Sequence, residues 1–191
     1  MAAMQADGER WLLSLIGDDG WMMEVLTATA SLALPDWWIG AGFVRGKAWD
    51  VLHGYRQRTP LADVDVIYFD PGDLSRTAER RAEERLCGRL ADVPWSVRNQ
   101  ARMHRKHGDA PYRDTEDALR HWLETPTCVA VTLRGDGTLM LAAPYGLDDL
   151  LAMVVRPTAA ARRRPEEYHE RLARKDWQGL WPRLTVLPAS A

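Results

Sequence analysis

The sequence predicts an α+β domain in which helices flank one central mixed β-sheet. Three observations support this fold class. Helical and strand-like segments alternate along the chain, each apolar strand-like run is short and ends at Gly, Pro or Asp, and Gly135-Asp136-Gly137 separates two alternating runs like a hairpin turn. The 191 residues suit one such domain.

The first half of the chain contains four expected helices and three expected strands. Apolar residues recur at helical spacing in the first two helices, which Asp18-Asp19-Gly20 and Leu34-Pro35-Asp36 interrupt. The third helix carries an apolar stripe, and Asp73 or Ser75 is the expected N-cap of a long charged helix. The order is helix 8–17, helix 21–33, strand 37–39, helix 43–53, strand 63–69, helix 75–91 and strand 93–98.

The second half is expected to hold a hairpin and a C-terminal helix. A short helix over 99–104 and a loop over 105–114 lead to a helix over 115–123, with Asp114 or Thr115 as its cap. The hairpin strands are 128–133 and 138–142, and a short helix runs into a strand within 147–155. Residues 159–165 are expected to form an exposed loop, followed by a helix from Pro165.

These segments suggest one domain without a linker. Residues 1–35 form its N-terminal helical pair, residues 36–156 its core, and residues 157–191 a C-terminal segment that packs on the core.

Composition narrows the class of protein. Hydrophobic residues make up 46% and charged residues 27%, which is ordinary for a globular chain. The net charge of −2 supplies no general attraction to nucleic acid or to an anionic membrane, so a long nucleic acid is not the expected partner. No apolar run is long enough to span a bilayer, the start lacks a signal-peptide pattern, and Cys87 and Cys128 cannot form a disulfide framework. A cytoplasmic location is therefore expected.

Nine tryptophans are many for this length. Most are expected to fill the core as large apolar side chains. One or two could instead stack on a nucleobase.

Two aspartates stand at the start of an apolar strand. Asp63 and Asp65 should point to the same face, about 7 Å apart along the strand, while Val64 and Val66 point into the core. Like charges this close raise each other's pKa unless a cation lies between them, and carboxylate oxygens suit Mg²⁺ or Mn²⁺. The alternative is that Asp63 is a turn residue and Asp65 a strand-end charge in water.

A turn made of Gly40, Ala41 and Gly42 precedes these aspartates. Its glycines permit positive φ and close approach of a ligand to the backbone, and the helix that follows favours an anion at its N-terminus. Arg45 in the first turn of that helix could reach a triphosphate or pair with Asp50. Together with the aspartates, the turn describes a nucleoside triphosphate site, although it could also be a simple strand-to-helix connection.

The order of these features resembles a known superfamily. A strand, a Gly-rich turn, a helix and then Asp-x-Asp at the start of an apolar strand is similar to the nucleotidyltransferase superfamily that includes DNA polymerase beta. IGAGFVRGKAWDVLHGYRQRTPLADVDVIYFD also resembles the opening of tRNA CCA-adding enzymes. More closely, the chain resembles a bacterial family of nucleotidyltransferase-like proteins, through PWSVRNQARMH (94–104), APYGLDDL (143–150) and KDWQGLWPRL (175–184).

The resemblance implies a polymerase-beta-like nucleotidyltransferase fold and a metal-dependent reaction. Nucleoside monophosphate would pass from an NTP to an unidentified acceptor hydroxyl, with Asp63 and Asp65 holding Mg²⁺ or Mn²⁺. The nucleotide would be bound by the residues of the turn and of the 94–104 motif, namely Gly40, Ala41, Gly42, Arg45, Asn99 and Arg102. For Asn99 and Arg102, the alternative is a solvated basic helix paired with nearby acids.

The chain departs from the superfamily pattern at one position. A third carboxylate usually acts on the acceptor hydroxyl from a later strand, but the expected strand 93–98 offers Ser96 and Arg98 and no acid. Asp70 should point to the Val64 face, and Asp148 and Asp149 are ordinary acids near a helix start. A second hypothesis is therefore an inactive nucleotide-binding or interaction protein that keeps the fold.

Overall fold

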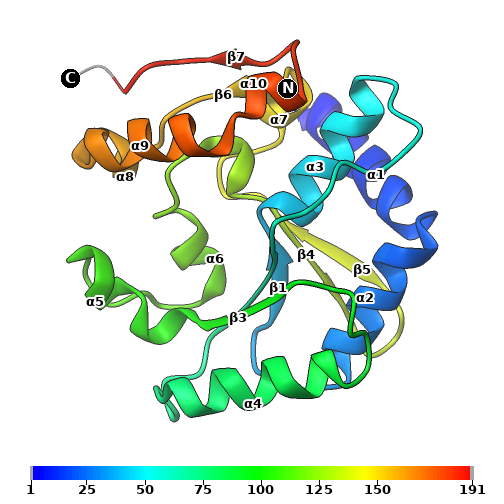
Figure 1. Cartoon of the computed structure of the whole chain (residues 1–191), viewed down its shortest axis with the longest axis vertical. Helices are drawn as coiled ribbons and strands as arrows, with labels where there is room; N and C mark the ends of the chain where they lie inside the picture. The colour runs from blue at the N-terminus through cyan, green and yellow to red at the C-terminus, as the bar shows by residue number, and fades with distance from the viewer. Residues whose placement is uncertain (1, 190–191) are drawn as a thin grey trace.

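The computed structural model describes residues 2–189, and its centre is a five-stranded mixed sheet (Figure 1). The strand order is β3-β2-β1-β4-β5. The central strand β1 is antiparallel to β2 and β4, β3 is parallel to β2, and β5 is antiparallel to β4. The strands are β1 (Trp38–Gly40), β2 (Val64–Tyr68), β3 (Trp95–Asn99), β4 (Ala130–Leu133) and β5 (Leu139–Ala142). The α+β fold with a mixed central sheet is thus confirmed.

Helices surround this sheet on several sides (Figure 1). Side-chain caps define several of their starts, as Asp19 accepts from the Met22 amide and Ser75 from the Ala78 amide. The helices are α1 (Ala2–Gly17), α2 (Gly20–Ala30), α3 (Gly42–Leu52), α4 (Arg76–Cys87), α5 (His104–His107), α6 (Thr115–Leu119), α7 (Asp148–Leu151), α8 (Ala159–Arg163), α9 (Pro165–Lys175) and α10 (Trp177–Leu180), with 3-10 turns η1 (Gln100–Arg102) and η2 (Thr125–Thr127).

The two faces of the sheet are covered differently. Val64 and Val66 of β2 and Val97 of β3 belong to the main core, to which α1, α2, α3 and α4 contribute apolar side chains. The alternate residues of the same strands face the other way, where Ile67 joins a smaller cluster around Leu119 of α6. The second face is therefore only partly covered, and polar side chains can reach a space above it.

Two expected segments differ from the structure. The expected helix 99–104 is divided into η1 and α5, since the Asn99 side chain caps η1 by accepting from the Ala101 amide. Residues 159–165 were expected to be an exposed loop, and this is wrong: residues 159–163 form α8, in which Ala160 and Ala161 are buried. Alanine favours helix and its small side chain permits close packing, while Pro165 can begin the next helix.

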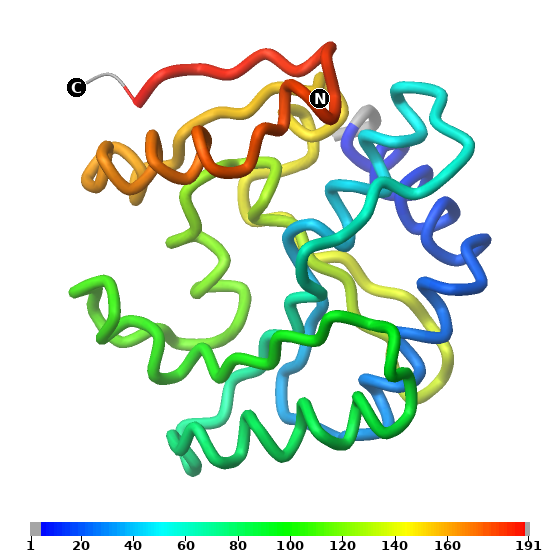
Figure 2. The backbone as a smooth tube through the Cα atoms, in the orientation of Figure 1, coloured from blue at the N-terminus to red at the C-terminus, as the bar shows by residue number. Residues whose placement is uncertain are grey.

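The C-terminal segment lies against α3. Trp181 donates from its indole nitrogen to the Asp50 carboxylate at 2.8 Å, and the Trp177 and Trp181 rings meet Trp49 edge to face. Strand β7 (Thr185–Val186) then pairs in parallel with β6 (Val154–Val155). Figure 2 follows this segment, in orange and red, across one end of the molecule.

None of the helices within residues 2–189 combines the length and apolar character needed to cross a lipid bilayer.

The buried carboxylate of Asp50 joins three segments and gives a first prediction. It accepts from the backbone amide and the hydroxyl of Thr59 at 2.9 and 2.6 Å and from Trp181. Asp50→Ala leaves these donors without an acceptor, so we expect the free energy of unfolding in urea to fall by about 2 to 4 kcal/mol. The exposed Asp92→Ala is the control and should change it by less than about 0.5 kcal/mol. An equal change in the free energy of unfolding for the two variants would contradict the role of Asp50 in joining these segments.

Candidate active site

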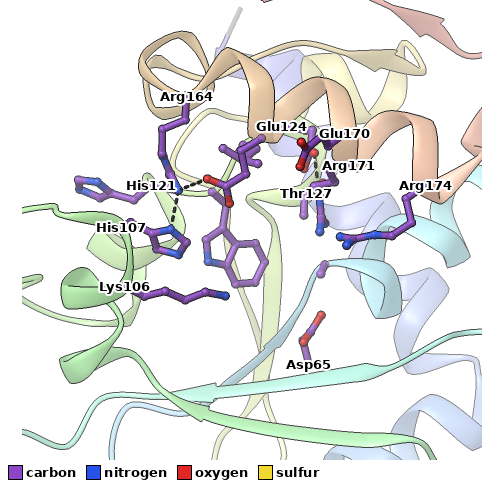
Figure 3. Close-up of a pocket in the computed structure, with 14 residues that line it drawn as sticks. Asp65, Lys106, His107, His121, Glu124, Thr127, Arg164, Glu170, Arg171 and Arg174 are labelled. Carbon is purple, nitrogen blue, oxygen red and sulfur yellow. Dashed lines mark hydrogen bonds and ion pairs between the residues drawn. The ribbon is translucent and has the colours of Figure 1, made fainter.

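A cleft of about 410 Å³ opens on the partly covered face of the sheet (Figure 3). The turn after β1 and Asp65 of β2 form one side, and α5, residues 121–124 after α6, and α9 supply the others. In Figure 3, Arg171 and Arg174 point from α9 toward Asp65, and Lys106 extends from α5. Most of its lining residues are charged or polar: Asp65, Lys106, His107, His121, Glu124, Thr127, Arg164, Glu167, Glu170, Arg171 and Arg174.

Asp65 projects into this cleft from the start of β2. Val64 and Val66 on either side of it are fully buried in the main core, so Asp65 lies on the opposite face. Burial and the neighbouring charge of Asp63 raise the pKa of Asp65 to about 6, although Arg171, Lys175 and a hydrogen bond with Ser96 act in the other direction. The two aspartates are thus close enough to repel each other in a partly desolvated position.

The turn between β1 and α3 borders the same cleft through Ala41. The positive φ expected at the glycines occurs instead at Ala41, where φ is 52°. Gly40 is required for a different reason, because a Cβ there would lie 3.1 Å from the Trp122 ring and 3.3 Å from the Val129 carbonyl oxygen. Ala41 provides no side-chain cap, so the first amides of α3 remain available to an anion.

Arg45 is a buried cation behind this turn. Its guanidinium donates to the Thr127 hydroxyl at 3.1 Å and lies 4.3 Å from the centre of the Trp177 ring, while its Nε has no protein partner in the described part of the chain. Burial and the nearby charge of Arg171 lower its pKa to about 10, against the opposing effect of Glu124, Asp65 and Asp63. Arg45 does not pair with Asp50, which binds Thr59 and Trp181.

An ion pair between Glu124 and Arg171, which the sequence analysis did not predict, lies beside the cleft. Glu124 is fully buried and accepts from Nε of Arg171 at 2.8 Å, and its other oxygen has no partner among residues 2–189. This contact fixes the Arg171 guanidinium beside the cleft. The sequence shows a basic end of the last long helix, with Arg171, Arg174 and Lys175. Because this segment lies about 100 residues after Asp65, its position beside the cleft could not be predicted from local patterns.

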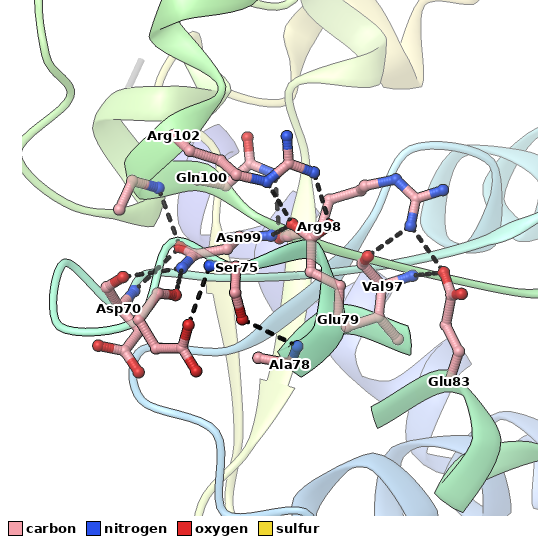
Figure 4. A network of polar contacts seen from close by, with 12 residues as sticks. Asp70, Ser75, Ala78, Glu79, Glu83, Val97, Arg98, Asn99, Gln100 and Arg102 are labelled. Carbon is pink, nitrogen blue, oxygen red and sulfur yellow. Dashed lines mark hydrogen bonds and ion pairs between the residues drawn. The ribbon is translucent and has the colours of Figure 1, made fainter. Parts of the chain in front are cut away.

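Asn99 and Arg102 are engaged outside the cleft (Figure 4). The Asn99 amide group donates to the carbonyls of Asp70 and Asp73 and accepts from the Asp70 and Ala101 amides. Arg102 binds the nearly buried Glu79 through two nitrogens. These contacts use the groups that were expected to bind nucleotide, and they hold β3, α4 and the loop after β2 together.

No acid replaces the third carboxylate on β3. The register places Ser96 beside Asp65 and Arg98 beside Ile67. Asp70 accepts from the Gly72 amide, and Asp149 is bound by Arg156 and Thr125. Within residues 2–189, no three His, Cys, Asp or Glu side chains come together as a ready metal site. Two aspartates are thus the carboxylates that the sheet presents at the turn.

A family model described as nucleotidyltransferase matches residues 27–186, which include the whole sheet and every residue that lines the cleft. The chain belongs to this nucleotidyltransferase family. This assignment confirms the resemblance found in the sequence motifs.

Solved structures agree with the family assignment. A solution structure described as revealing a CCA-adding enzyme head domain is 32% identical, with a TM-score of 0.83 over 93% of this chain and 94% of that one. The Thermotoga maritima CCA-adding enzyme complexed with tRNA is 14% identical, with a TM-score of 0.57 over 94% of this chain and 42% of that one. A tRNA-processing enzyme with CTP is 18% identical, with a TM-score of 0.53 over 86% and 43%. The last two share the fold, and no curated protein sequence matches the chain.

Repulsion between the aspartates gives a prediction for stability. Because the pKa of Asp65 is raised from 3.8 to about 6, the folded protein binds more protons than the unfolded chain in that interval, and the free energy of unfolding falls as pH rises through it. At pH 7 without divalent cations, Asp65→Asn should therefore increase that free energy by about 1 to 3 kcal/mol. Mg²⁺ should raise the Tm of the unmodified protein but not of this variant.

The control for this measurement is Asp148→Asn, which removes an exposed carboxylate that does not line the cleft. It should leave the response to Mg²⁺ unchanged. A lower free energy of unfolding in Asp65→Asn at pH 7 would argue against repulsion between the two carboxylates. An increase of Tm with Mg²⁺ as large as in the unmodified protein would argue against it too.

The pairing of Arg102 with Glu79 gives a third prediction. Arg102→Ala leaves the Glu79 carboxylate without its cation and should lower the free energy of unfolding by about 1 to 3 kcal/mol. Adding Glu79→Gln should recover part of this loss, since the uncompensated charge disappears. Calorimetric affinity for an NTP should stay unchanged in both variants, and a tenfold weaker affinity would restore the nucleotide-binding hypothesis for Arg102.

Proposed function

We propose that the protein is a metal-dependent nucleotidyltransferase that moves a nucleoside monophosphate from an NTP to an acceptor hydroxyl. The observation that supports this most directly is the position of Asp65, next to Asp63, in a cation-rich cleft beside the uncapped start of α3. Membership of the nucleotidyltransferase family supplies the reaction class.

Asp63 and Asp65 would hold Mg²⁺ or Mn²⁺. Their oxygens are the hard ligands that these ions prefer, and a cation would relieve the repulsion that raises the pKa of Asp65. Such an ion usually keeps water and phosphate ligands, so two carboxylates are a sufficient protein contribution. When bound, it would neutralise charge on the phosphates during transfer.

The remaining groups fit a triphosphate. Backbone amides around Gly40, Ala41 and Gly42 face a position where the dipole of α3 favours an anion, and Arg45 adds a buried positive charge behind them. Arg171 offers the rest of its guanidinium to phosphate oxygens while Glu124 holds its Nε. In the reaction, the acceptor oxygen forms a bond to the α-phosphorus, the bond to the bridging oxygen breaks, pyrophosphate leaves, and the hydroxyl proton passes to solvent.

The solved relatives suggest the donor more clearly than the acceptor. One is described with CTP and another with tRNA, which supports an NTP as the donor and includes an RNA end among the acceptors to test. The net charge of −2 favours local contact with an acceptor over a long nucleic-acid interface.

A second candidate function is nucleotide binding without transfer. The observation in its favour is Ser96, which stands beside Asp65 where an acid would complete the superfamily pattern. In that case the cleft would hold an NTP and its metal for recognition by a partner.

The test is turnover of labelled NTPs with Mg²⁺ or Mn²⁺ and a panel of hydroxyl acceptors. Asp63→Ala and Asp65→Ala together should reduce transfer by at least about 100-fold, whereas Asp148→Ala should not change it. Transfer at the original rate in the double variant would exclude the aspartates as metal ligands. If NTP and metal raise the Tm but no acceptor is modified, the binding function is supported instead.

A further inference from the structure

Trp122 is the one large aromatic side chain in the lining of the cleft. The only other apolar residues there are Ala41 and Leu123, which are 5% and 7% exposed. Trp122 is partly exposed and also lines a neighbouring hollow of about 130 Å³, which shares Asp65, His107 and His121 with the cleft. A flat apolar surface thus lies beside the proposed reaction centre, among groups that are otherwise charged or polar.

The structure holds this indole in a fixed position. The Trp122 amide donates to the Leu119 carbonyl, and the Trp122 carbonyl accepts from the Thr158 hydroxyl at 2.6 Å. Its ring packs against the cluster around Ile67 and Leu119. A Cβ added at residue 40 would lie only 3.1 Å from this ring. Gly40 therefore leaves the space that the Trp122 ring occupies against the sheet.

This chemistry differs from what the rest of the cleft offers. Arginines and the first amides of α3 suit phosphate oxygens, but they give no surface for the faces of a purine or pyrimidine. An aromatic ring supplies that surface, and stacking tolerates any base because each has a π face.

We propose that Trp122 is the stacking surface for the nucleobase of the NTP, with the phosphates directed toward Asp65, Arg171 and the start of α3. This inference rests on the proposed function, because it assigns the base end of the same nucleotide. Trp122 acts as a binding residue and takes no part in the transfer of the nucleotidyl group.

The experiment compares two kinds of polyphosphate anion, with and without a nucleoside. Calorimetry with Mg²⁺ measures the affinity for ATP, for CTP and for inorganic tripolyphosphate, which has no base. Trp122→Leu should weaken both NTPs by about 5- to 100-fold and leave tripolyphosphate unchanged, whereas Trp122→Phe should keep most of the affinity. Trp38→Leu is the matched control, because Trp38 packs on the same apolar cluster but does not line the cleft.

Several outcomes would overturn the inference. Unchanged NTP affinity in Trp122→Leu would do so, as would an equal loss for tripolyphosphate, which would indicate a structural role. If the unmodified protein binds tripolyphosphate as tightly as it binds ATP and CTP, the nucleoside adds no affinity. That result would contradict the stacking role of Trp122 and would still support the phosphate site. If it binds neither anion, the proposed function itself fails.

A second measurement avoids dependence on the folding of the leucine variant. The protein is labelled with 5-fluorotryptophan, and Trp122→Phe assigns its resonance by loss of one fluorine signal. Stacking predicts that ATP and CTP shift the Trp122 signal strongly and that tripolyphosphate shifts it little. None of the three ligands should shift the Trp38 signal. A Trp122 signal that does not respond to either NTP at saturation would contradict the proposal.

Discussion

The organisation of the cleft depends on one electrostatic constraint, the partly buried carboxylate of Asp65 in β2, which lies close enough to Asp63 for the two charges to repel each other. Val64 and Val66 must enter the core, so the strand alternation forces Asp65 onto the partly covered face, beside Asp63. Burial makes the charged form costly and, with the charge of Asp63, raises the pKa of Asp65. The positive groups around the cleft, and the proposed metal, follow from the need to compensate this charge.

The compensation comes from a distant part of the chain. Arg171 reaches the cleft from α9, where the buried Glu124 holds its Nε, and Trp177 lies against the guanidinium of Arg45. The contact between Trp181 and Asp50 attaches the same C-terminal segment to α3. The segment therefore does more than cover the core, because its position determines which cations face Asp65.

Two residues around β3, Asn99 and Arg102, fit both a nucleotide-binding role and a structural role. Arginine and asparagine beside a nucleotide site are plausible ligands, and the resemblance to a nucleotidyltransferase family favoured that role. In the structure, Asn99 closes the loop after β2 and Arg102 neutralises Glu79. The same register brings Ser96 to Asp65, at the place where an acid would complete the superfamily pattern.

Local patterns in the sequence determined the order of most helices and strands, the Gly40–Gly42 turn and the position of Asp65 on the face opposite Val64 and Val66, because alternation and capping act within a few residues. The family motifs added the fold. What only the tertiary structure decided was which distant side chains meet: Glu124 with Arg171, Trp177 with Arg45, and Trp122 over Gly40. Such contacts depend on how the C-terminal helices pack across the sheet, and no local spacing in the sequence records that packing.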